Sequence, residues 1–238
     1  MHNHTGTLFM SFQRQGAGHG EWNLLPKPYY QQDGITIYHA DCREILPHLP
    51  KVDLVLTDPP YGIGKQIYRK NKSVNNATYH TDYGDYLEWD KKPIAQVTMD
   101  EIISKGERAC IWGGNYYHME PSSCWLIWDK EQFTDNFADA ELAWTNYDRA
   151  VRIKKCLWCG MIRKNNEKRF HPTQKPVEIM AWAMSLARTY NTILDPFMGS
   201  GTTLVAAKQL HRQAIGIEIE ERYCEIAVKR LGQGVLPL

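Results

Sequence analysis

Residues 52–61 read VDLVLTDPPY, an apolar run followed by a short polar turn. The run from Val52 to Thr57 has the nearly continuous apolar composition of a strand that is buried on both faces of a parallel sheet. The turn from Asp58 to Tyr61 therefore comes at the carboxyl end of that strand, where open α/β sheets bind their ligands. The stretch predicts an α/β fold with a ligand site at Asp58.

The polar turn offers several groups that a ligand can use. Pro59 and Pro60 have no N–H and hold the chain extended, so their carbonyls are available as hydrogen-bond acceptors. Asp58 adds a carboxylate and Tyr61 adds an aromatic face. Together these groups suit a planar base with an exocyclic amine, because they supply two acceptors for the amino hydrogens and a ring for stacking.

A glycine-rich loop, DPFMGSG from Asp195 to Gly201, lies between a predicted strand, Thr192–Leu194, and a predicted helix, Thr202–His211. Glycines allow a nucleotide-type ligand to approach the backbone closely, and a helix N-terminus directs N–H groups at it. Glu218 ends the next predicted strand, near the position of an acid that binds ribose hydroxyls. The alternative for Glu218 is an ordinary acid at a strand end.

Two other nucleotide-binding loops fit this stretch less well. A P-loop needs a lysine after its last glycine, whereas Gly201 is followed by Thr202 and Thr203. A dinucleotide dehydrogenase needs a third glycine where this chain has Leu204.

Too few residues follow Glu218 to complete a doubly wound sheet, so the missing strands must come from the N-terminal part. The chain therefore reads as a circular permutation, with the Asp58 half first and the glycine-rich loop last. The further predicted strands are Ile35–Ala40, Ala109–Trp112, Cys124–Trp128, Ala140–Trp144 and Ala214–Ile219. The further predicted helices are Arg43–Leu49, Pro93–Lys105, Pro176–Arg188 and Glu221–Leu231.

Three stretches of the chain resemble motifs of one family. Asp58-Pro59-Pro60-Tyr61 resembles the catalytic motif of amino-methylating DNA methyltransferases, which methylate adenine N6 or cytosine N4 with S-adenosylmethionine. The stretch from Asp195 to Thr203 resembles the cofactor loop of that family, and HPTQKP at residues 171–176 resembles a third motif. Their order is that of the β group, and the resemblance runs from about residue 35 to residue 232.

This resemblance implies a Rossmann-like, circularly permuted α/β methyltransferase fold and assigns roles to residues. Asp58 to Tyr61 would bind and orient the amine of a flipped base. The implied cofactor contacts are Asp41, Cys42, Thr173, Lys175, Asp195, Phe197, Gly199, Ser200, Gly201, Thr202, Thr203 and Glu218. Lys175 and Thr173 would bind the methionine carboxylate beside a helix N-terminus. Asp41 would contact the adenine of the cofactor, and it equally suits the N-cap of the helix that follows it.

The composition is typical of a soluble globular protein, with 238 residues, 43% hydrophobic and 23% charged. No apolar run approaches the roughly 18 residues that span a bilayer. The polar residues 1–28 predict a flexible tail and residues 29–238 a single domain. The six cysteines form no disulfide framework, so a reducing cytoplasm is expected. The resemblance implies the cytoplasm of a prokaryote or of a phage-infected host cell. Cys156 and Cys159 have C-x-x-C spacing without a second pair, so no metal is expected.

Basic residues cluster in two segments, although the net charge is only +1. Residues 62–90 and 147–170 are expected to be irregular and to contact or recognise DNA, because clustered cations with interleaved aromatic rings suit phosphate contacts. The DNA-binding candidates are Lys65, Arg69, Lys70, Lys72, Arg152, Lys154, Lys155, Arg163, Lys164, Lys168 and Arg169. Nucleic acid is therefore the expected partner, and the resemblance implies double-stranded DNA.

Aspartate at the first motif position is usual for adenine N6 enzymes of the family, with cytosine N4 as the alternative target. Methylation of RNA or of a protein amide, and a non-catalytic DNA-binding module, are further alternatives. Asp58 and the basic segments disfavour the amide, and the intact cofactor loop disfavours the binding module. Because no separate recognition domain is evident, recognition is expected to be short, degenerate or shared by a homodimer.

Overall fold

The computed structural model describes residues 25–62, 92–131, 138–159, 162–163, 174–188 and 191–233. The strands are β1 (Tyr30–Gln32), β2 (Ile35–His39), β3 (Val52–Thr57), β4 (Gly106–Trp112), β5 (Trp125–Asp129), β6 (Ala140–Thr145), β7 (Arg152–Lys155), β8 (Trp158–Cys159), β9 (Ile162–Arg163), β10 (Thr192–Asp195) and β11 (Gln213–Glu218). The α-helices are α2 (Cys42–Ile45), α5 (Gln96–Ser104), α6 (Val177–Leu186), α7 (Thr202–Gln209) and α8 (Glu221–Gly232). Two 3-10 helices, η2 (Leu46–His48) and η3 (Gly114–Tyr116), complete the described elements.

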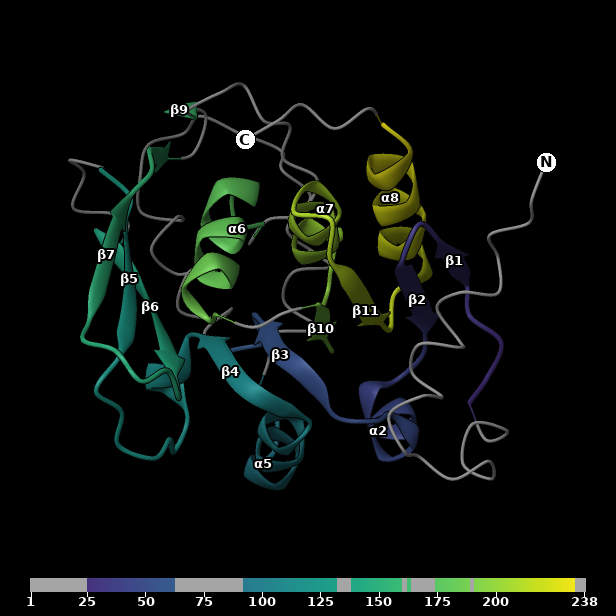
Figure 1. Ribbon diagram of the computed structural model, residues 1–238, viewed down its shortest axis with the longest axis horizontal. Coiled ribbons are helices and arrows are strands. Elements are labelled where there is room, and N and C mark those ends of the chain that lie inside the picture. The colour runs from purple at the N-terminus through teal and green to yellow at the C-terminus, as the bar shows by residue number, and fades with distance from the viewer. Residues whose placement is uncertain are drawn as a thin grey trace, which may run out of the picture.

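Nine of the described strands form one mixed sheet in the order β1-β2-β11-β10-β3-β4-β6-β5-β7 (Figure 1). The five strands β2, β11, β10, β3 and β4, adjacent in this order, run parallel to one another. Strand β6 is antiparallel to both β4 and β5, and β1 is antiparallel to β2. The strands of the glycine-rich half, β10 and β11, thus lie between strands of the N-terminal half, as the predicted permutation requires.

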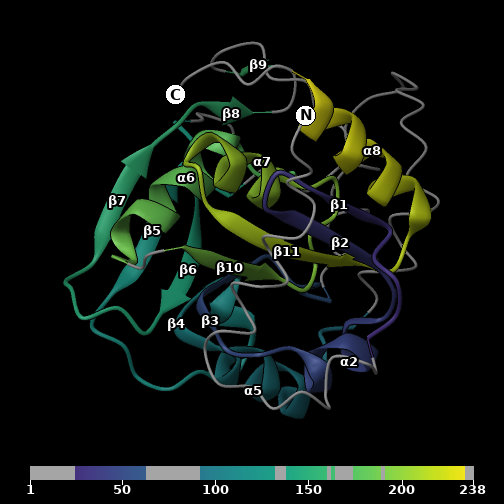
Figure 2. The same ribbon diagram turned by 45° about the vertical axis from the view of Figure 1, so that its right-hand side comes forward.

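Helices cover both faces of the sheet. Figure 1 shows α6, α7 and α8 on one face and α2 and α5 on the other, and the turned view in Figure 2 shows the same layers. Strand β3 alternates between them: Leu54 and Leu56 pack with the first set of helices, and Val52 and Val55 with the second. All four side chains are buried, which confirms the prediction of a strand that is covered on both faces.

The irregular structure predicted for residues 147–170 is wrong in part. Strand β7 pairs in parallel with β5 at the edge of the sheet, and β8 pairs with β9. The sequence does not predict β7, because its four residues are mostly exposed and basic, as the residues of edge strands often are. Only the backbone of β7 joins the sheet. The short β1 has no counterpart among the predicted strands, and residues 1–24 of the predicted tail lie outside the described residues.

Within the described residues, no helix is long and apolar enough to cross a membrane. The same residues contain no group of three or more His, Cys, Asp and Glu side chains that could hold a metal ion. Cys156 is buried, and the side chain of Cys159 lies outside the description.

Candidate active site

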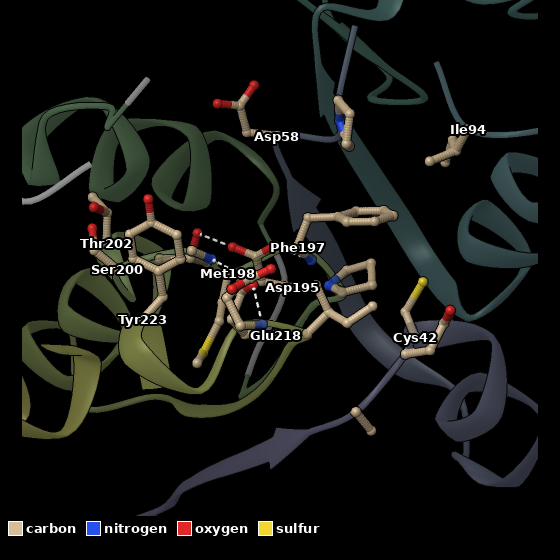
Figure 3. Close-up of a pocket in the computed structure, with 18 of the residues that line it drawn as sticks. Cys42, Asp58, Ile94, Asp195, Phe197, Met198, Ser200, Thr202, Glu218 and Tyr223 are labelled. Atoms are coloured by element: carbon tan, nitrogen blue, oxygen red, sulfur yellow. Dashed lines mark hydrogen bonds between the residues drawn. The ribbon is translucent and has the colours of Figure 1, made fainter. Parts of the chain in front are cut away.

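A cavity of about 900 Å³ opens at the carboxyl edge of the sheet, lined by residues at the ends of β2, β3, β10 and β11. Strand β10 lies where the strand order changes direction, with β11 on one side of it and β3 on the other. Open α/β sheets bind ligands at such a point. Figure 3 shows Asp58, Asp195, Glu218 and Cys42 arranged around this cavity.

Asp195 anchors the glycine-rich loop from inside. Its carboxylate accepts hydrogen bonds from the hydroxyls of Thr57 (2.7 Å) and Thr203 (2.5 Å) and from the backbone N–H of Phe197 (3.1 Å). Burial raises the pKa of Asp195 to about 6, although these donors favour the charged form. Asp195 thus ties the loop to β3 and to the first turn of α7, and it also borders the cavity.

The loop needs glycine for conformation and for contact. Gly201 has φ +79°, and a Cβ atom there would lie 2.7 Å from the Cβ of Ala227 on α8. Gly199 has φ +51°, and a Cβ atom there would meet nothing within 4 Å. Gly201 therefore lets helix α8 pack against the loop, whereas the open space at Gly199 leaves room for a ligand to approach the backbone.

Arg230, which the sequence analysis missed, supports the loop from α8. It is buried, and its guanidinium donates to the carbonyl of Ser200 (2.7 Å), the hydroxyl of Ser200 (3.1 Å) and the hydroxyl of Thr202 (3.1 Å). The sequence does contain a signal for a buried Arg230, because this residue follows the buried residues Tyr223 and Ala227 at helical spacing. A cation on the buried face of an amphipathic helix indicates a specific partner.

Glu218 borders the cavity and is held by backbone donors. Its two carboxylate oxygens accept from the N–H of Gly199 (3.0 Å) and of Glu220 (2.9 Å). Burial raises the pKa of Glu218 to about 7, and the backbone hydrogen bonds oppose that shift. The carboxylate therefore joins the end of β11 to the glycine-rich loop and still faces the cavity.

Most of the remaining predicted cofactor residues in the described chain also line this cavity: Asp41, Cys42, Lys175, Phe197, Ser200, Thr202 and Thr203. Gly201 lies in the glycine-rich loop beside it. Asp41 is the N-cap of α2, where it accepts from the backbone N–H of Arg43 at 2.9 Å. The guanidinium of Arg43 also contacts this carboxylate and lowers the pKa of Asp41. The N-cap role is thus confirmed, and the contact to a cofactor stays a prediction. Thr173 lies outside the described residues.

The turn after β3 is held by tyrosines. The hydroxyl of Tyr61 donates to Asp58, and the hydroxyl of Tyr117 donates to the carbonyl of Pro60. The ring of Tyr61 stacks on Tyr116 of η3, with 4.9 Å between ring centroids and 19° between the planes. Pro59 is buried, whereas Asp58 and Pro60 border the cavity. Tyr116 and Tyr117 had no sequence signal, because only the fold brings η3 beside the turn.

Lys175 has other partners than the sequence predicted. Instead of standing free as an anion site, its ammonium forms ion pairs with Asp58 (2.5 Å) and with Glu141 on β6 (3.1 Å). The lysine side chain is 4% exposed, and a buried cation requires such anionic partners. Burial alone would lower the pKa of Lys175, but Asp58 and Glu141 outweigh it and raise that pKa. The sequence analysis missed Glu141.

Few of the predicted DNA contacts are described. Arg152 and Lys155 are exposed on β7, and Lys155 lies 3.7 Å from Asp129. Lys154 is half-buried and forms an ion pair of 2.8 Å with Glu178 of α6, so part of its charge serves the fold. The other candidates lie outside the described side chains: Lys65, Arg69, Lys70, Lys72, Arg163, Lys164, Lys168 and Arg169.

Comparisons with known proteins agree with this geometry. A family model described as DNA methylase (N6_N4_Mtase) matches residues 141–229. The type II methyltransferase M.ScaI of Streptomyces caespitosus is 26% identical, with 87% of this chain and 84% of that protein covered. The type II methyltransferase M2.DpnII of Streptococcus pneumoniae is 28% identical, with 87% and 93% covered.

Among solved structures, PvuII DNA methyltransferase (cytosine-N4-specific) has the same fold. It matches with a TM-score of 0.59 at 14% identity, over 90% of this chain and 92% of that one. The sheet order is thus that of an α/β methyltransferase fold. Motif order and the sequence matches confirm the resemblance to β-group amino-methylating DNA methyltransferases.

Proposed function

We propose that this chain transfers the methyl group of S-adenosylmethionine to N6 of adenine in double-stranded DNA. One observation carries the proposal: Asp58 and the glycine-rich loop border the same cavity. An acceptor for an amine and a loop suited to a nucleotide-type cofactor therefore lie within reach of one another. Cytosine N4 is the second candidate, because it also presents an amine beside a ring nitrogen.

The residues of the cavity fit S-adenosylmethionine. Its volume of about 900 Å³ is at the large end for small-molecule sites, so it has room for a cofactor and part of a base. We assign the ribose hydroxyls to Glu218, the adenine end to Asp41 and Cys42, and ring packing to Phe197. Gly199 leaves space for close backbone approach. When bound, the cofactor supplies a methyl group on a positively charged sulfur.

In the proposed mechanism, Asp58 and the carbonyl of Pro59 accept hydrogen bonds from the amino group of the target base. The base leaves the duplex stack to reach this pocket. The two acceptors aim the nitrogen lone pair at the methyl carbon, while Tyr61 provides the aromatic face for the base. The nitrogen would bond to the methyl carbon as the bond from that carbon to sulfur breaks and leaves a neutral thioether. The nitrogen would lose a proton toward Asp58, with no covalent intermediate on the enzyme. Orientation supplies most of the acceleration.

Adenine is favoured over cytosine by Asp58 at the first position of the motif. We propose residues 62–90 and 147–170 as the DNA-contacting segments of a single domain that works in the cytoplasm, alone or as a homodimer. Strand β7, at the edge of the sheet beyond β5, carries exposed cations that suit contact with the phosphates of the bound duplex.

The exposed cations of β7 give the first test of the DNA contact. Replacing both Arg152 and Lys155 with Ala should weaken binding to all DNA sequences alike. It should also reduce the log–log salt slope by about 0.9 for each lost phosphate contact. The matched control is Lys229→Ala, which changes an exposed lysine of α8, at the opposite end of the sheet from β7. A slope equal to that of the control would place the phosphates elsewhere.

The pH dependence of cofactor binding tests Glu218. Hydroxyl donors prefer the carboxylate, so binding should lower the raised pKa of Glu218 and release a proton. We therefore expect affinity to rise with pH up to about 7 and then level off. Glu218→Gln should flatten this profile and weaken binding by about 1–3 kcal/mol at pH 8. Calorimetry that finds the same affinity and the same pH profile in both proteins would contradict the assignment.

Transfer of a labelled methyl group to different acceptors tests the proposed substrate class. We expect label in unmethylated duplex DNA and none in RNA or in protein. Asp58→Ala serves as the inactive control for contaminating activity. Label that enters RNA or protein at the rate found for DNA would overturn the proposal.

A further inference from the structure

The ammonium of Lys175 is enclosed by groups from three separate parts of the fold. Lys175 precedes α6, Asp58 follows β3 and Glu141 lies in β6. Besides its two ion pairs, Lys175 donates to the hydroxyl of Tyr61 at 3.2 Å. Its charge also lies 5.3 Å from the ring centroid of the buried Trp112. The lysine is thus fixed by contacts on several sides.

A second lysine extends this arrangement away from the cavity. Lys130 pairs with Glu141 at 2.5 Å, and its charge lies 5.1 Å from the ring centroid of Trp128. Charges therefore alternate from Asp58 through Lys175 and Glu141 to Lys130. We call these four residues the charge chain. Only its first two members, Asp58 and Lys175, line the cavity.

The charge chain restricts the orientation of the Asp58 carboxylate. Tyr61 donates to one carboxylate oxygen, Oδ1, and Lys175 contacts the other, Oδ2. With a donor on each oxygen the carboxylate cannot rotate freely, and charge-assisted contacts of this kind are the stronger ones. The oxygens retain lone pairs for a further donor, because an ionised carboxylate accepts up to about four hydrogen bonds.

We propose that Lys175 is a positioning residue, which Glu141 and Lys130 hold in place so that it fixes the Asp58 carboxylate toward the target amine. This inference rests on the proposed function and deepens it. It gives the lysine of the HPTQKP stretch a role in orienting the acceptor of the amine, in place of binding the methionine carboxylate of the cofactor.

The groups that face Asp58 predict how its titration responds to substitution. Burial raises the pKa of Asp58, Lys175 opposes that shift, and Glu141 adds to it. Tyr61 donates to the carboxylate, and Asp195 is the neighbouring acid on β10. Loss of the lysine charge should therefore raise the pKa of Asp58, and loss of the Glu141 charge should lower it. Activity that needs ionised Asp58 falls on the acidic side of its pH profile.

The test is the single-turnover rate against pH at saturating DNA and S-adenosylmethionine. Lys175→Met should lower the optimal rate by about 10²-fold and move the acidic limb to higher pH. Glu141→Gln should lower the rate by a smaller factor and move the limb to lower pH. Lys208→Met, which removes another lysine from an ion pair with Asp33, is the matched control and should change neither.

Cofactor affinity, measured by calorimetry, separates this role from carboxylate binding. We expect it to change less than threefold in Lys175→Met. A loss of tenfold or more, with an unmoved acidic limb, would assign Lys175 to the cofactor and overturn the inference. If Lys175→Met does not fold, Glu141→Gln decides alone, because lost packing would not shift the limb to lower pH. Wild-type protein that methylates no DNA would instead refute the proposed function.

Discussion

Asp58→Ala should abolish methyl transfer while leaving cofactor binding largely intact. The variant loses the carboxylate that we expect to accept from the target amine, and the rate should fall by about 10³-fold. Cofactor affinity should stay within threefold, because the cofactor is expected to contact the glycine-rich loop and Glu218 instead. Single-turnover rates and calorimetry measure the two quantities.

The control for this prediction separates chemistry from folding. The Asp58→Ala substitution would take one of the two acidic partners from Lys175 and leave it Glu141, so thermal unfolding must show that the variant is folded. Asp58→Asn keeps the shape and one acceptor oxygen, and we expect it to retain more activity than the alanine variant. Near-normal turnover by folded Asp58→Ala would refute the proposed mechanism.

Gly113→Ala should lower the rate about as strongly as Lys175→Met. Gly113 has φ +66°, and a Cβ atom there would lie 2.0 Å from a ring carbon of Tyr61. The ring must therefore move, which breaks its contact with Asp58 and its stacking on Tyr116. Because small displacements in an active site are costly, the rate should fall by about 10²-fold. Cofactor affinity should hardly change.

Gly232→Ala is the matched control for the glycine substitution. A Cβ atom at Gly232, at the end of α8, would meet nothing within 4 Å. We expect this variant to keep the wild-type rate. Equal rates for the Gly113 and Gly232 variants would mean that the position of Tyr61 does not matter for transfer.

The sequence predicted the strands of the sheet centre well. Residues such as Leu54 and Val55 are apolar because both faces of β3 are covered, and that pattern is visible in the chain. The permutation also followed from counting, since too few residues come after Glu218 to complete the sheet. Strand β7 could not be predicted, because its pairing is a property of the backbone and its basic side chains show no alternation.

The partners within the site were less predictable than the motifs. Asp58, Asp195 and Glu218 could be predicted as site residues, because they lie at the ends of predicted strands. The contact of Lys175 with Tyr61 joins residues 114 positions apart, and no spacing rule reaches that far. In the sequence, Glu141 lies within a predicted strand and Lys130 lies shortly after one, and no motif marks either residue. Their importance depends on the fold, which places them behind Lys175.

The identity of the methylated base tests the central claim most directly. Unmethylated duplex DNA is incubated with the enzyme and labelled S-adenosylmethionine, digested to nucleosides and analysed by mass spectrometry. We predict that the label is found in N6-methyladenine and that Asp58→Ala leaves the DNA unlabelled. Label in N4-methylcytosine alone would contradict the proposed target, and label in neither base would contradict the function itself.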